Sequence, residues 1–135
     1  DSNGYFYIKD DMKTFIDRVD QFMIDLKFFD DELHYFYTGV HNQLIKDNIL
    51  KLYDMNKLYE VRTVFYGSEE SFNDIIKINE FLPNDIHYKI IPYHTHGVRK
   101  EFQPLFKVPS EKEIQKMDAY LDKNRQSYEI IKIEL

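Results

Sequence analysis

Two histidines, His94 and His96, stand at the end of residues 87–94, a segment typical of a β-strand. Alternate residues of a strand share one face, so we expect both imidazoles to point toward one position. A catalytic zinc takes three protein ligands and keeps a fourth position for water. Glu113 lies one turn into the next expected helix and is the expected third ligand. The spacing therefore predicts a zinc site with an open coordination position.

The same residues also have structural interpretations. Ser110 and Glu113 form a Ser-x-x-Glu pattern before an apolar helical run, which is typical of a capping box. In a capping box the two side chains bond to backbone N–H groups of the first turn instead of binding a ligand. A His-x-His at a strand end is also found as a pair of polar surface residues. The sequence leaves both interpretations open.

The composition indicates one compact domain spanning residues 1–135. The 11 tyrosines and 11 phenylalanines are expected to supply much of its core. The absence of cysteine excludes a thiol nucleophile, a disulfide framework and a cysteine-based zinc site. A formal net charge of -6, with lysines and arginines scattered along the chain, argues against nucleic acid as a partner.

The hydropathy of the chain predicts no association with a membrane. The mean hydropathy is -0.57, and no apolar run approaches the ~20 residues that a membrane-spanning helix needs. No charged-then-apolar leader follows Asp1, so we expect a cytoplasmic protein whose natural N-terminus lies elsewhere.

The first half of the chain predicts alternating strands and helices. Residues 5–9 are expected to form a strand, and apolar residues at helical spacing predict a helix from Met12 to Leu26. Residues 34–40 are expected to form a second strand, which Gly39 closes. Residues 42–57 suit either a helix or a long connection, and we favour the helix.

The second half continues this alternation. Strands are expected over residues 59–66, 87–94 and 128–133, with a helix over residues 71–81 and another after Pro109. The order predicts an α/β single domain with a central mixed β-sheet flanked by helices.

Two motifs resemble those of the JAMM/MPN metalloprotease domain family. Glu32 is followed seven residues later by Gly39, and the run Tyr93-His94-Thr95-His96 is similar to the strand ending of that family. The chain is identified as a divergent member over nearly its whole length. The resemblance implies a JAMM/cytidine-deaminase-like layering of the sheet and helices.

The resemblance also implies roles for five residues. His94, His96 and Glu113 would be the ligands of Zn2+, Glu32 the general base, and Ser110 a hydrogen-bond donor to the oxyanion. The implied activity is that of a zinc-dependent peptidase or isopeptidase of the ubiquitin-like deconjugation type. Its partner would be a protein or peptide substrate, for example a ubiquitin-like modifier laid along a sheet edge.

Other functions remain open at this level, and so do the oligomeric state and the question of whether the chain is an enzyme. Glu113 stands where the family has aspartate, which favours a non-catalytic MPN-like protein-interaction module with a degenerate metal site. A nuclease is a third choice that the acidic net charge disfavours. A cupin-like metal site is disfavoured because a helix is expected after Pro109 and the chain has only 4 glycines.

Overall fold

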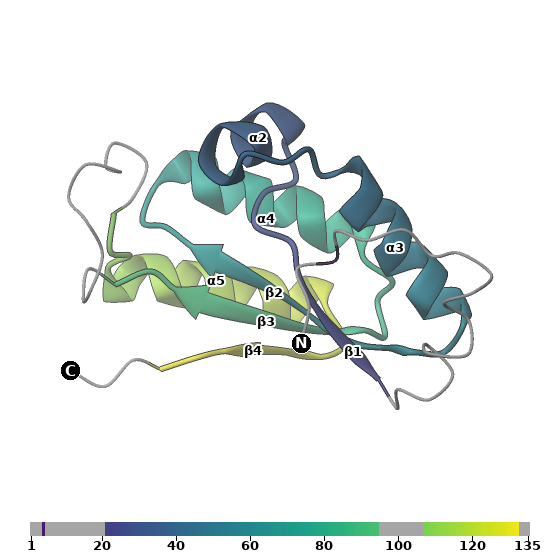
Figure 1. Ribbon diagram of the computed structural model, residues 1–135. Coiled ribbons are helices and arrows are strands. Elements are labelled where there is room, and N and C mark those ends of the chain that lie inside the picture. Colours follow the sequence, from purple (N-terminus) through teal and green to yellow (C-terminus); the bar gives the residue numbers. More distant parts are fainter. Residues whose placement is uncertain (1–3, 5–20, 95–106, 133–135) are drawn as a thin grey trace. The chain divides into compact units, whose positions relative to one another are not determined.

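A computed structural model describes Gly4 and residues 21–94 and 107–132 (Figure 1). Strands and helices alternate along these residues, so the predicted α/β class is confirmed. The elements are β1 (Phe22–Asp25), α2 (Asp31–Thr38), α3 (Gln43–Asp54), β2 (Leu58–Phe65), α4 (Glu69–Phe81), β3 (His87–Pro92), α5 (Glu111–Asn124) and β4 (Tyr128–Ile130). Within the described residues, no helix has the length and hydropathy needed to cross a membrane.

The strands form one four-stranded sheet in the order β1-β2-β3-β4. The pair β1–β2 is parallel, with Ile24 opposite Val61, and the pair β3–β4 is parallel, with Ile90 opposite Ile130. We expected a mixed sheet, whereas both of these pairs are parallel. Parallel neighbours need a crossover connection, and the helices between successive strands provide it.

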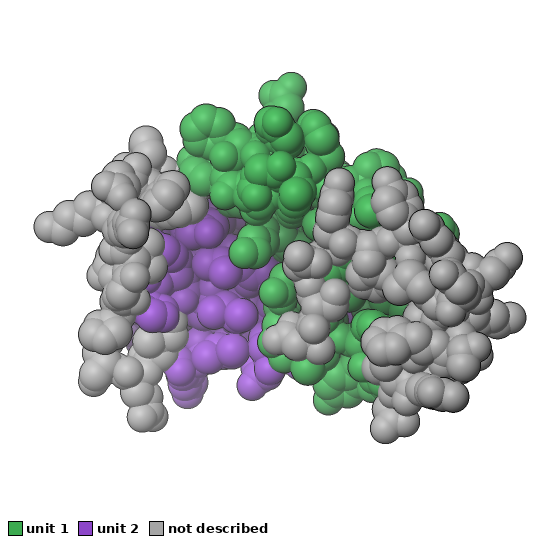
Figure 2. Space-filling view, viewed as in Figure 1, with its two compact units in different colours: residues 1–62 green, residues 63–135 purple. Residues whose placement is uncertain are grey.

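The chain divides into two compact units, residues 1–62 and residues 63–135, which we call the N-terminal and C-terminal units (Figure 2). β2 begins in the first and ends in the second. Whether residues 1–135 act as one domain stays a prediction.

The core of the N-terminal unit is aliphatic. Its aliphatic side chains with no more than 2% exposure are Ile24, Leu26, Ile45, Ile49, Leu52 and Val61. Burial of each Ile or Leu side chain contributes about 1.5–3 kcal/mol. Asn48 is also buried, and its Nδ2 donates to the carbonyl oxygen of Gly4 at 2.7 Å.

The strand that we expected over residues 34–40 is wrong, because these residues form most of α2 and the turn after it. Asp30 caps the helix, and its carboxylate accepts from the backbone N–H of Leu33 at 3.0 Å. Gly39 ends the helix in the left-handed region, with φ +79°, and its N–H donates to Tyr35 O at 2.8 Å. These two caps outweigh the strand propensity of the tyrosines and phenylalanine between them.

The helix that we expected from Met12 to Leu26 is also wrong at its C-terminal end, because Phe22–Asp25 is β1. Phe22, Ile24 and Leu26 are buried at every second position, which is the period of a strand. Residues 12–20 and the strand expected over 5–9 lie outside the described residues.

The remaining predicted elements are confirmed. The helix favoured within 42–57 is α3, the helix within 71–81 is α4, and the helix after Pro109 is α5. The strands expected over 59–66 and 87–94 are β2 and β3, and the last strand is β4.

In the C-terminal unit, α4 and α5 pack against each other. Phe72 of α4 and Tyr120 of α5 have ring centroids 6.1 Å apart, and Asn79 Nδ2 donates to Tyr120 Oη at 3.2 Å. Arg125, only 6% exposed, follows α5 and donates to backbone carbonyls after α4, including Ile86 O at 3.0 Å. These bonds satisfy a buried guanidinium, whose loss of water contacts would otherwise be costly.

Candidate functional site

The carboxyl ends of β2 and β3 lie together in the C-terminal unit. The backbone N–H of Tyr93 donates to Phe65 O at 2.8 Å, and the rings of Tyr66 and Tyr93 have centroids 5.1 Å apart. Both tyrosines are less than 10% exposed. In open parallel sheets, ligands bind outside the carboxyl ends of the strands. This end of the sheet is therefore the first candidate site.

The chain after residue 107 closes against the end of β2. Gly67 N–H donates to Lys107 O at 2.7 Å, and a Cβ on Gly67 would lie 2.8 Å from Pro109 Cα. Only glycine permits that approach without movement of the backbone. Ser68 then caps α4, accepting from Ser71 N at 3.1 Å, while Ser71 Oγ accepts from Tyr66 N at 3.0 Å.

His94 directly follows this strand end and is half-buried. Its Nδ1 atom is buried and has no hydrogen-bond partner among the described residues. A buried polar atom that lacks a partner is costly. Within the described residues, His94 is therefore a candidate ligand contact at this end of the sheet.

Ser110 and Glu113 form the capping box of α5. Ser110 Oγ accepts from Glu113 N at 3.2 Å, and Ser110 N donates to Glu113 Oε1 at 2.9 Å. The structural interpretation of this motif is thus the one observed. The carboxylate that we expected to bind a metal is bonded to the backbone at the start of its own helix.

The remaining expected site residues are Glu32 and His96. Glu32 is an exposed residue in the first turn of α2, in the N-terminal unit, whereas His94, Ser110 and Glu113 belong to the C-terminal unit. His96 lies outside the described residues. Among the residues that are described, no group of three or more His, Asp or Glu side chains could hold a metal ion.

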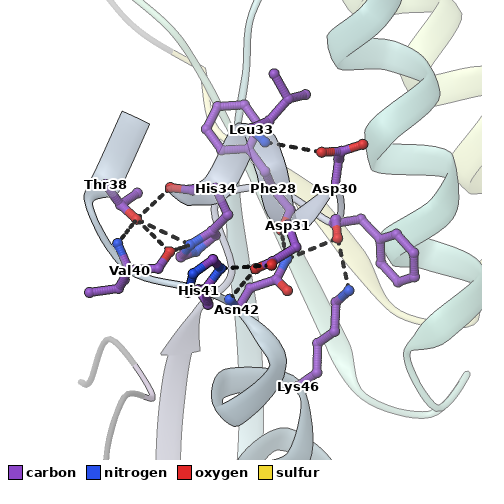
Figure 3. A network of polar contacts seen from close by, with 11 residues as sticks. Phe28, Asp30, Asp31, Leu33, His34, Thr38, Val40, His41, Asn42 and Lys46 are labelled. Atoms are coloured by element: carbon purple, nitrogen blue, oxygen red, sulfur yellow. Dashed lines mark hydrogen bonds and ion pairs between the residues drawn. The ribbon is translucent and has the colours of Figure 1, made fainter. Parts of the chain in front are cut away.

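A second polar cluster joins α2 to α3 in the N-terminal unit (Figure 3). Asp31 Oδ1 accepts from the backbone N–H of Asn42 at 2.7 Å, and its Oδ2 lies 2.8 Å from His41 Nδ1. The hydrogen bond from Asn42, and then that from His41, hold the pKa of Asp31 below its usual value. The ring of His41 stacks on that of Tyr35, with centroids 4.4 Å apart.

Asn42 connects this cluster to the segment after β1. It is 1% exposed, and its Nδ2 donates to the carbonyl oxygens of Phe28 and Phe29, each at 2.9 Å. Lys46 Nζ donates to Phe29 O at 2.8 Å and lies 3.8 Å from the centroid of the Phe29 ring. One buried amide thus fixes the path of the backbone into α2.

The side chain of His34 bonds to the backbone just after the C-terminal end of α2. It is 2% exposed, and its Nδ1 bonds to Val40 O at 2.8 Å, so the Nδ1–H tautomer donates there. Thr38 Oγ1 donates to His34 O at 2.6 Å and accepts from Val40 N at 3.2 Å. Burial lowers the pKa of His34, which favours the neutral imidazole.

Comparison with known proteins gives relatives of a different class from the one expected. The chain is 32% identical over 112 residues to the choline trimethylamine-lyase activating enzyme of Oleidesulfovibrio alaskensis. This alignment covers 78% of the chain and 36% of that enzyme. It is 35% identical over 86 residues to the pyruvate formate-lyase-activating enzyme of Staphylococcus aureus, and this alignment covers 61% of the chain and 34% of that enzyme. The chain therefore spans about a third of the length of the curated relatives it matches. No family model matches it.

The fold also has a solved counterpart. A domain of a pyruvate-formate lyase-activating enzyme from Bacteroides vulgatus superimposes with a TM-score of 0.76, covering 97% of this chain and 79% of that domain. The sequence identity is 22%, so this likeness establishes the fold. The sequence similarity is to activating enzymes of lyases, and the solved structure shows the fold.

These findings correct five of our expectations. The resemblance to the JAMM/MPN family is wrong, because the relatives are lyase-activating enzymes. The zinc-dependent peptidase or isopeptidase activity is wrong for the same reason, and the alternative MPN-like module and the description as a hydrolase fall with it. Zn2+ as the cofactor is wrong as well. Short motifs such as His-x-His and Ser-x-x-Glu recur by chance, and here one of them is a helix cap.

No role was assigned from the sequence to His34, His41 and Asn42 in the polar cluster that joins α2 to α3. His34 and His41 were given no role, because neither has ligand spacing to another histidine. Asn42 was placed only within an ambiguous segment. A usable signal was present in Asp30 and Gly39, which have the spacing of an N-cap and a C′ glycine around eight residues.

Proposed function

We propose that this chain is part of an activating enzyme whose substrate is another protein, a lyase. The observation that carries the proposal is the 32% identity over 112 residues to the choline trimethylamine-lyase activating enzyme. The match to a pyruvate formate-lyase-activating enzyme over 86 residues also supports it. A protein partner is the part of our original expectation that this proposal retains.

The residues present limit what the chain itself contributes. If activation uses an iron–sulfur cluster with S-adenosylmethionine, the cluster needs cysteine thiolates as ligands. The 135 residues contain no cysteine, so they do not fit that group. We therefore assign the chain to recognition of the protein substrate and to shaping the ligand-binding end of the sheet.

The end of the sheet formed by β2 and β3 suits the second task. The rings of Tyr66 and Tyr93 pack together there, and His94 adds one buried nitrogen without a described partner. A few convergent polar groups on an apolar surface are typical of small-molecule sites. We propose that His94 contacts a small molecule bound at the carboxyl ends of β2 and β3.

Direct binding to a lyase tests the proposal. Purified chain would be measured by biolayer interferometry against immobilised pyruvate formate-lyase and choline trimethylamine-lyase, with serum albumin as the control. Saturable binding to at least one lyase, and none to albumin, is expected. Equal signals on all three surfaces, or no signal on either lyase, would refute the proposed function.

A further inference from the structure

The exposed face of α2 carries two large aromatic side chains. Phe36 is 78% exposed and Tyr35 is 52% exposed. His34 is the only fully buried residue of this helix. An amphipathic helix normally turns its aromatic residues toward the core, so outward-facing rings require another explanation.

The rings are held in place from one side. Tyr35 stacks on His41 with an interplanar angle of 17°, and His41 is fixed by Asp31 at 2.8 Å. Phe36 meets the ring of Tyr37 edge-on, with centroids 4.9 Å apart. Fixed aromatic side chains lose little conformational entropy when a partner covers them.

Carboxylates accompany both rings. Asp31 precedes Tyr35 by four residues, and Glu32 precedes Phe36 by four, so each acid is a neighbour of a ring on the helix surface. α2 contains these acids in its first turn and no basic residue in its last turn. A cationic side chain placed over either ring would thus lie close to a carboxylate.

We propose that Asp31, Glu32, Tyr35 and Phe36, which we call the α2 surface, dock a basic segment of the protein partner. Arginine suits this surface best, because its planar guanidinium stacks on aromatic rings and pairs with carboxylates at once. Charge complementarity carries the choice, since the surface is acidic and the whole chain has a net charge of -6. The inference rests on the proposed function for the identity of the partner.

The first test measures lyase binding with matched variants. Phe36→Ser and Tyr35→Ser are compared with Leu50→Ser and Tyr59→Ser, since Leu50 is 41% exposed and Tyr59 shares the 52% exposure of Tyr35. The α2 variants are expected to weaken binding by about tenfold or more, and the controls to leave it within about twofold. Glu32→Lys should also weaken binding to the lyase. Raising NaCl from about 50 to 500 mM should reduce the difference in affinity between Glu32→Lys and the natural chain, because salt screens charge interactions.

The second test uses an arginine-rich peptide as the probe, with its glutamate-rich counterpart as the control. Amide chemical shifts of the chain should move in α2 and at His41 on addition of the arginine peptide, and the effect should be lost in Phe36→Ser. Shifts spread evenly over the acidic surface, or unchanged in Phe36→Ser, would overturn the inference. So would a chain that self-associates through α2, because its occupant would then be a second copy.

The two tests separate the two proposals. If the chain binds a lyase and the α2 variants bind equally well, the docking surface is wrong and the proposed function stands. If no lyase binds but the arginine peptide docks on α2, the surface stands and the proposed function fails. If neither ligand binds, both are wrong.

Discussion

At the scale of single residues, the buried amide of Asn42 stabilises the N-terminal unit. Asn42 Nδ2 donates to two backbone carbonyls, and its side chain is almost fully covered. Asn42→Ala leaves both carbonyls without this donor, so we expect a loss of about 1–3 kcal/mol in the free energy of unfolding. Urea denaturation measures it, with the exposed neighbour change Gln43→Ala as the control. Equal midpoints for the two variants would contradict the role of Asn42.

His34 makes stability depend on pH. Its folded pKa lies below the unfolded value of about 6.5, so the unfolded state takes up the proton first as pH falls. Stability is therefore full above about pH 6.5 and decreases below it, down to the folded pKa. Asp31 raises the pKa of His34, whereas Lys27 and Lys46 lower it further.

The variant His34→Asn retains an N–H for the Val40 carbonyl and does not titrate. Its melting temperature is expected to fall less than that of the natural chain between about pH 7 and pH 5. Melting curves in a series of buffers provide the measurement. Parallel pH profiles would mean that another group is responsible.

At the scale of elements, α2 shows why propensity alone misled. Its tyrosines and phenylalanine favour a strand, but Asp30 and Gly39 fix its two ends. The helix α4 was predictable and α3 was favoured over a connection, because their apolar residues recur at helical spacing, and isoleucines of both helices are buried. β1 could not be separated from the preceding pattern by spacing alone, since four residues carry too little periodicity.

Gly39 gives a direct test of the α2 boundary. At φ +79°, an alanine is strained, although nothing lies within 4 Å of an added Cβ. Gly39→Ala should therefore cost about 1–2 kcal/mol, and Gly39→Asn less, because asparagine tolerates the left-handed region better. Chemical denaturation of the three chains checks this order. A Gly39→Ala chain as stable as the natural one would show that the helix ends differently.

The same contrast holds for the candidate site. The sequence predicted that a strand ends at His94, whereas β3 ends at Pro92, two residues earlier. It could not supply the function of that residue, because a ligand's chemistry depends on side chains from distant parts of the chain. Ser110 and Glu113 were chosen for a pattern that backbone capping explains fully.

At the scale of the whole molecule, most of the chain is similar in sequence to activating enzymes. The matched region is about a third of the length of those enzymes. The fold resembles that of an activating-enzyme domain, and we propose that the acidic, aromatic surface of α2 docks a protein partner. A chain of this kind should compete with a full activating enzyme for its lyase.

The most direct measurement is activation of Staphylococcus aureus pyruvate formate-lyase by its own activating enzyme, under anaerobic conditions, with increasing amounts of this chain. Lyase activity should appear more slowly as the chain is added, and the Phe36→Ser chain should inhibit less than Leu50→Ser. An activation rate that stays constant at saturating amounts of the folded chain would contradict the central claim that it recognises a lyase.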